Sequence, residues 1–245
     1  MFLAVFEKYG IIVIMKEQLT AEMNKYVNPE RIEATAHFFG ICPGGYGEGD
    51  ILLGLPVPLA RKIALQYKTM PASEIVELLH SKVHEHRFAA LEILVAQYKK
   101  NPDQSRQILL DNIEAANNWD LVDVITWRIL GMWALEHHDE KIFHKLAKSK
   151  SLWERRIAVV SYMAFYRKGV MGDGPEIIEE LLSDKEPLLH KACGWMLREI
   201  YWRVDKHFVE SFIIDHYKEM SRTTLRYAIE RMPEAQRKQF LKGEF

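Results

Sequence analysis

The sequence predicts an all-α protein, and two kinds of observation support that prediction. Apolar residues recur at helical spacing, as in Phe88, Leu91, Val95 and Tyr98. No stretch shows the strict apolar and polar alternation that is typical of a half-buried strand. The predicted fold class is therefore all-α.

A third observation, an internal repeat, predicts how the helices are arranged. A basic residue followed by small or apolar residues recurs at separations of 69, 35 and 35 residues, at Arg87, Arg156, Lys191 and Arg226. A period near 35 with one repeat missing near residue 122 is typical of stacked helix pairs, each of which buries its apolar face against the next. We expect a helical-repeat solenoid with one concave wall; a compact helical bundle is the alternative.

The elements follow in order along one predicted domain, residues 1–245. Residues 1–28 are expected to form an N-terminal helix or an extension before a second start at Met15, because Glu7 and Lys8 interrupt the apolar stretch that an export signal needs. Glycines and prolines concentrate in residues 40–58, which predicts one irregular loop. Later prolines stand at expected helix boundaries, at Pro102, Pro175, Pro187 and Pro233.

Composition excludes several classes of protein. The two cysteines, Cys42 and Cys193, are too few for a disulfide framework or a four-cysteine zinc site, and they suit a reducing cytoplasm, where we expect the protein to reside. The total of 33 basic and 34 acidic side chains hides a segregation of charge. Residues 141–168 carry eight basic side chains and one acidic one. This block is either a solvated helix face or a phosphate-binding surface.

One short motif combines a carboxylate with an indole. Trp119 and Asp123 in NNWDLVD are four residues apart and so share a helix face, while Asp123 lies off the apolar stripe of that helix. A plain structural reading is also open, because acids near a helix N-terminus are favoured by the helix dipole and Trp119 can be a core residue. Trp127, Trp133, Trp153 and Trp202 are read as packing residues.

Together with WERRIAV around Arg156 and GWMLRE around Trp195, this motif resembles the AlkD-like alkylpurine DNA glycosylases, which are built from HEAT-like repeats. The resemblance runs from about Pro29 to about Arg237. It implies that Asp123 is the catalytic aspartate, with Trp119 and Trp195 as the active-site tryptophans. It also implies a HEAT-like solenoid with a concave basic face, and DNA contacts at Arg156, Arg198 and Arg61. From the basic block we add Arg155 and Lys150 as expected DNA contacts.

The chain departs from the best-known branch of that family at two places. Phe38 falls near an active-site tyrosine of that branch, so a hydroxyl is lacking there, and the glycine-rich loop around Tyr46 is longer. Both differences bear on substrate range more than on reaction class.

The function expected from this resemblance is DNA alkylation repair. A monofunctional glycosylase would hydrolyse the N-glycosidic bond of N3- or N7-alkylated purines in double-stranded DNA, acting as a monomer without a cofactor or metal. The alternative is a non-catalytic helical-repeat module that binds DNA or protein. His84-Glu85-His86 and His137-His138-Asp139 do not have the spacing of a metal motif.

Overall fold

The structure is a computed structural model that describes residues 14–245. This part of the chain is helical, and its one β-type contact is an isolated bridge between Ile51 and Val83. The all-α prediction is confirmed. The prediction for residues 1–13 lies outside the described residues, and Met15 is the first residue of a helix. Within residues 14–245, every helix is too short or too polar to cross a bilayer.

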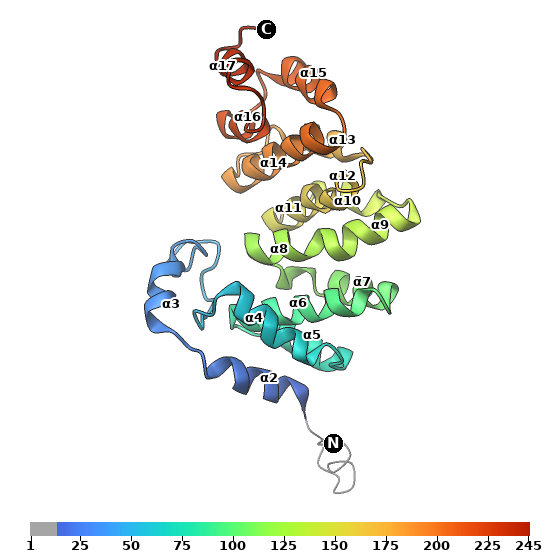
Figure 1. Ribbon diagram of the computed structural model, residues 1–245. Coiled ribbons are helices and arrows are strands. Elements are labelled where there is room, and N and C mark those ends of the chain that lie inside the picture. Colours follow the sequence, from blue (N-terminus) through green and yellow to red (C-terminus); the bar gives the residue numbers. More distant parts are fainter. Residues whose placement is uncertain (1–13) are drawn as a thin grey trace, which may run out of the picture. The chain divides into compact units, whose positions relative to one another are not determined.

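The chain separates into two compact units, which meet in sequence between Asn118 and Trp119. The prediction of one domain over residues 1–245 stays a prediction. The first unit has six α-helices among its described residues: α2 (Met15–Asn24), α3 (Pro29–Ala36), α4 (Val57–Ala64), α5 (Ala72–Leu79), α6 (His84–Tyr98) and α7 (Pro102–Asp111). Helix α6 is the core of this unit, because α4, α5 and α7 all contact it (Figure 1).

The glycine-rich loop between α3 and α4 is irregular, as predicted, and polar groups at the start of α6 hold it. The Glu85 carboxylate accepts hydrogen bonds from the backbone N–H groups of Leu53, Gly54 and Leu55 at 2.9, 2.8 and 3.3 Å. Gly54 has a φ of 77°, and an added Cβ would lie 2.5 Å from the Asn28 carbonyl oxygen, so this position requires glycine. The loop is therefore fixed to the core of the first unit.

The second unit continues the helical repeat. Its elements are α8 (Trp119–Thr126), the π-turn η4 (Trp127–Gly131), α9 (Met132–His137), α10 (Lys141–Ala147), α11 (Leu152–Ser161), α12 (Met163–Tyr166), α13 (Gly174–Leu181), α14 (Pro187–Arg203), α15 (Lys206–His216), α16 (Arg222–Ala228) and α17 (Glu234–Lys242). Helices α8, α11, α14 and α16 pack in that order, each against the next, and α10 and α13 pack beside them (Figure 1). Such ordered packing is the arrangement that a helical repeat predicts.

Glycines set two of these close contacts. An added Cβ on Gly131 would lie 2.1 Å from the Ser161 carbonyl oxygen of α11, and one on Gly194 would lie 2.5 Å from the Thr224 carbonyl oxygen of α16. Since only glycine permits such close approach of two helix backbones, Gly131 fixes the spacing of η4 and α11, and Gly194 fixes that of α14 and α16. Gly194 directly precedes Trp195, and Gly131 follows Asp123 by eight residues.

Candidate active site

The second unit brings together two predicted site residues, Asp123 on α8 and Arg156 on α11. Arg156 Nε donates to Asp123 Oδ1 at 2.8 Å and Arg156 Nη2 donates to Oδ2 at 2.6 Å, which is a bidentate ion pair. The Arg156 side chain is only 6% exposed, whereas that of Asp123 is 18% exposed. The carboxylate therefore has a fixed orientation and retains contact with the surface of the unit.

Two effects oppose each other at this carboxyl group. Burial raises the pKa of Asp123 above that of an ordinary aspartate, while the adjacent Arg156 guanidinium lowers it. Because an arginine stays protonated at all ordinary pH values, the pair favours the ionised form of Asp123. The site thus holds a carboxylate in surroundings that would otherwise favour its protonation.

The tryptophans lie on the helices that carry this pair. Trp119 is half-buried one turn before Asp123 on α8, so the two side chains share a helix face. On α14, the Leu188 carbonyl oxygen accepts a hydrogen bond from Arg156 Nη1, and the half-buried Trp195 follows Leu188 by seven residues, two turns along the same side. Arg156 therefore links the helix of Trp119 and Asp123 to that of Trp195.

The other predicted DNA-contacting arginines also have internal carboxylate partners. In the second unit, Arg155 Nε donates to Asp184 Oδ2 at 2.7 Å, and Arg198 Nη1 donates to Glu230 Oε2. In the first unit, Arg61 Nε donates to the buried Glu92 Oε1 at 2.9 Å. Each partner lies about one repeat away in sequence, so these pairs connect neighbouring repeats. Phosphate binding by these three residues stays a prediction, and a phosphate would have to compete with a carboxylate.

The basic block of residues 141–168 is partly neutralised. Lys148, Arg155 and Arg156 each have a carboxylate partner. Lys150 is exposed and forms no ion pair within residues 14–245, and its predicted DNA contact stays a prediction. Arg167 is held in another way, because its guanidinium lies over the Trp127 ring at 4.6 Å from the ring centroid. The reading of Trp127 as a packing residue missed this contact, which links residues 40 positions apart.

The two histidine motifs have structural surroundings. Glu85 holds the glycine-rich loop, and His84 and His86 are buried at the start of α6. His137 stacks on Trp133, one turn earlier in α9, at a centroid distance of 4.1 Å. These contacts give both motifs a structural role, and the expectation that neither is a metal site stays a prediction.

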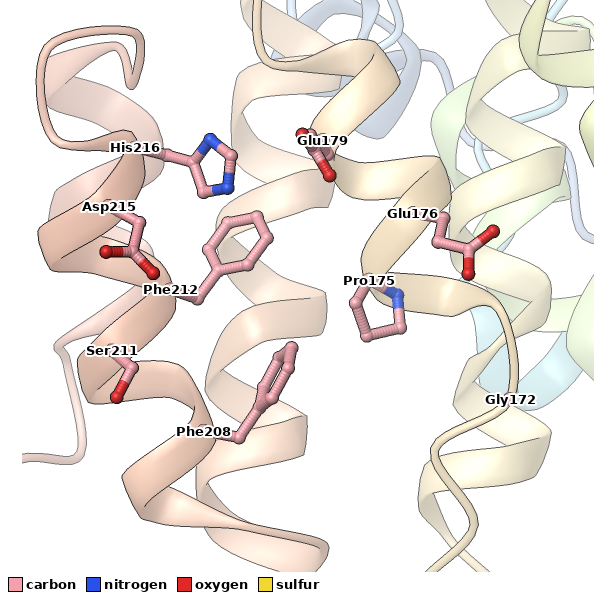
Figure 2. A pocket seen from close by; sticks show the side chains of 9 residues that line it. All are labelled: Gly172, Pro175, Glu176, Glu179, Phe208, Ser211, Phe212, Asp215 and His216. Atoms are coloured by element: carbon pink, nitrogen blue, oxygen red, sulfur yellow. The ribbon is translucent and has the colours of Figure 1, made fainter.

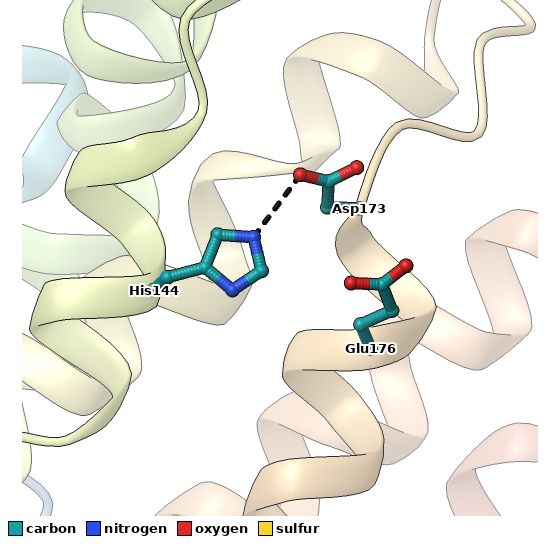
Figure 3. Close-up of side chains that lie close together, drawn as sticks. All are labelled: His144, Asp173 and Glu176. Atoms are coloured by element: carbon teal, nitrogen blue, oxygen red, sulfur yellow. Dashed lines mark hydrogen bonds and ion pairs between the residues drawn. The ribbon is translucent and has the colours of Figure 1, made fainter.

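A third group of side chains could hold a metal ion by geometry alone. His144 Nε2 lies 3.0 Å from Asp173 Oδ2, and one donor atom each of His144, Asp173 and Glu176 lies within 4.8 Å of the others (Figure 3). The three residues are half-buried or exposed, on α10 and at the start of α13. The hydrogen bond between His144 and Asp173 is enough to explain why these two side chains lie close together. The expectation of a metal-free protein stays a prediction.

A hollow of about 430 Å³ between α13 and α15 has the wrong charge for nucleic acid. Phe208, Phe212 and His216 follow one face of α15 (Figure 2). Three carboxylates surround them, those of Glu176, Glu179 and Asp215. These acids would repel a phosphate backbone, which distinguishes this surface from that of the Asp123 and Arg156 pair.

Comparisons with known proteins agree with the resemblance. The family described as DNA alkylation repair enzyme matches residues 19–232. No curated protein sequence matches the chain. Among solved structures, a predicted DNA alkylation repair enzyme from Enterococcus faecalis superimposes with a TM-score of 0.68 at 17% sequence identity, covering 84% of this chain and 97% of that chain. At this identity, the structural likeness concerns the fold.

Proposed function

The chain belongs to the DNA alkylation repair enzyme family, and from that premise we propose that it is a monofunctional DNA glycosylase acting on alkylated purines. The observation that supports this proposal best is the oriented Asp123 carboxylate, held by Arg156 one turn after Trp119. The DNA partner follows from the family, and the reaction from the chemistry of the site.

The proposed reaction requires little from the protein as an acid. A purine alkylated at N3 or N7 carries a positive charge and leaves readily, so protonation of the leaving base is dispensable. As the glycosidic bond breaks, the deoxyribose acquires oxocarbenium character. A fixed carboxylate stabilises that developing cation and orients the attacking water, which is the role we propose for Asp123.

Arg156 would act through Asp123 in this scheme. Its two hydrogen bonds fix the plane of the carboxylate, and its charge lowers the pKa of Asp123 against the effect of burial. We propose this positioning role in addition to the predicted phosphate contact. Trp119 and Trp195 would pack on the sugar, since aromatic faces favour positive charge.

Base release from methylated DNA tests the proposal. Wild-type protein is expected to release 7-methylguanine or 3-methyladenine from methylated duplex DNA, and Asp123→Asn is expected to abolish release while DNA binding survives. Binding without release from either lesion in the wild type would overturn the proposal and favour the alternative, a non-catalytic DNA-binding module.

A further inference from the structure

A second hollow of the second unit, of about 450 Å³, has the opposite charge to the one in Figure 2. It is lined by Trp127, Met132, Ala164, Arg167, Lys168 and Arg203. Arg203 is bonded to the buried Glu199 at 2.7 Å. Arg167 and Lys168 are exposed, and neither forms an ion pair within residues 14–245. The hollow therefore has two cations whose charges no bound carboxylate cancels.

Trp127 holds one of these cations without neutralising it. The Arg167 guanidinium lies over the indole ring, and such a contact restrains the plane of the guanidinium while its N–H donors stay available at the edge. Arg156, by contrast, directs its donors to a carboxylate and a carbonyl oxygen. Arg167 is thus oriented for an external anion, whereas a phosphate at Arg156 would have to share the guanidinium with Asp123.

The hollow lies farther along the helices that carry the candidate active site. Trp127 follows Asp123 by four residues, one turn later. Arg167 follows Arg156 by eleven residues, which is three turns and returns to the same side of the α11–α12 segment. Arg203 is the last residue of α14, the helix of Trp195. The hollow and Asp123 are thus carried by the same set of helices, so a DNA strand bound at Asp123 could also contact the hollow.

We propose that this hollow binds a backbone phosphate of the DNA duplex, with Arg167 and Lys168 as the ligands. The proposal rests on the proposed function for the identity of the partner. It places a contact outside the reacting nucleotide, at residues that the sequence motifs do not include. Arg167 supplies planar donors for phosphate oxygens and Lys168 supplies a flexible point charge.

The salt dependence of DNA binding tests this contact. A fluorescein-labelled duplex without lesions is titrated with wild type and with Arg167→Ala/Lys168→Ala at several KCl concentrations. Each neutralised phosphate contributes about 0.9 to the slope of log K against log salt concentration, so loss of the one phosphate held by both side chains should make the slope about 0.9 less steep. The matched control is Lys238→Ala/Lys242→Ala, which removes two charges that carboxylates already pair, and should change the slope much less.

Two further measurements separate the possible outcomes. Both residues are exposed, so thermal unfolding should be unchanged, and Arg167→Lys should retain most of the slope. A double variant whose slope equals that of the wild type would overturn the proposal. It would also be overturned if the double variant bound DNA like the wild type but no longer bound a free nucleoside monophosphate, since that result would indicate a nucleotide site. Absence of base release by the wild type, with the slope changed as expected, would overturn the glycosylase function and leave this contact standing.

Discussion

Arg156 on α11 donates two hydrogen bonds to the carboxylate of Asp123 on α8, at 2.8 and 2.6 Å. A third N–H group donates to the Leu188 carbonyl oxygen of α14. One guanidinium therefore connects three consecutive helices of the repeat. The Arg156 charge lowers the pKa of Asp123 against the effect of burial, and the arrangement makes the stability of the second unit depend on the same groups as the proposed reaction.

The first prediction concerns that stability. Asp123→Asn leaves the 6% exposed Arg156 side chain without its carboxylate, and removing one partner of a buried pair costs about 3 kcal/mol. We expect urea unfolding to show a loss of this order. Asp123→Asn/Arg156→Gln, which removes both charges, should recover much of it and remain inactive in base release. An Asp123→Asn variant as stable as the wild type would contradict this view of the pair.

The second prediction concerns the pH dependence of base release. The reaction needs the carboxylate, so the rate should fall as pH falls through the pKa of Asp123, and burial places that pKa above the ordinary value for aspartate. Arg156→Gln removes the charge that lowers this pKa, so the acidic limb should move to higher pH. Single-turnover rates across a pH series, with spontaneous depurination subtracted, measure the shift. If the acidic limb of the pH–rate profile were unchanged in Arg156→Gln, Arg156 would not affect the pKa of Asp123.

A third prediction follows from the close approach at Gly131. Alanine in place of glycine stabilises an unhindered helix by about 1 kcal/mol. An added Cβ on Gly131 would lie 2.1 Å from the Ser161 carbonyl oxygen, so Gly131→Ala should separate η4 from α11 and destabilise the protein by about 1 to 3 kcal/mol. The free energy of unfolding of Gly131→Ala is to be compared with that of the wild type. A more stable variant would contradict the close approach at Gly131.

The fourth prediction concerns His86 in the first unit. Burial lowers its pKa to about 4 from an ordinary value of 6.5, with a smaller contribution from the Arg87 charge. The unfolded chain thus binds a proton between these values while the folded protein does not. Stability should fall as pH falls from about 6.5 to about 4, by up to about 3 kcal/mol. Urea unfolding across this range should show a weaker pH dependence for His86→Gln; equal dependence in both proteins would rule out this histidine as the cause.

Much of the fold could be predicted because it depends on local patterns. Helical periodicity and the repeat near 35 residues give the all-α fold class and the ordered packing, and each later proline stands at a helix start. Pro102 and Pro187 are the first residues of α7 and α14, Pro175 is the second residue of α13, and Pro233 directly precedes α17. These features need only the preferences of the chain itself.

The site could be predicted only in part, because pairing between helices depends on tertiary geometry. Asp123 and Arg156 come from motifs 33 residues apart, and the residue types of each do not specify their bidentate contact. The same holds for Arg155 with Asp184, and for Arg167 with Trp127. Charge counting identifies the basic block but does not separate cations that carboxylates neutralise from those that remain available to DNA.

Single-turnover release of the methylated base tests the central claim most directly. Wild type, Asp123→Asn and the stability-matched double variant Asp123→Asn/Arg156→Gln are each held in excess over methylated duplex DNA, and free 7-methylguanine and 3-methyladenine are quantified against a reaction without protein. We predict release by the wild type alone, with all three proteins bound to the DNA. Release by Asp123→Asn at the wild-type rate, or none by DNA-bound wild type, would contradict the proposed glycosylase activity of Asp123.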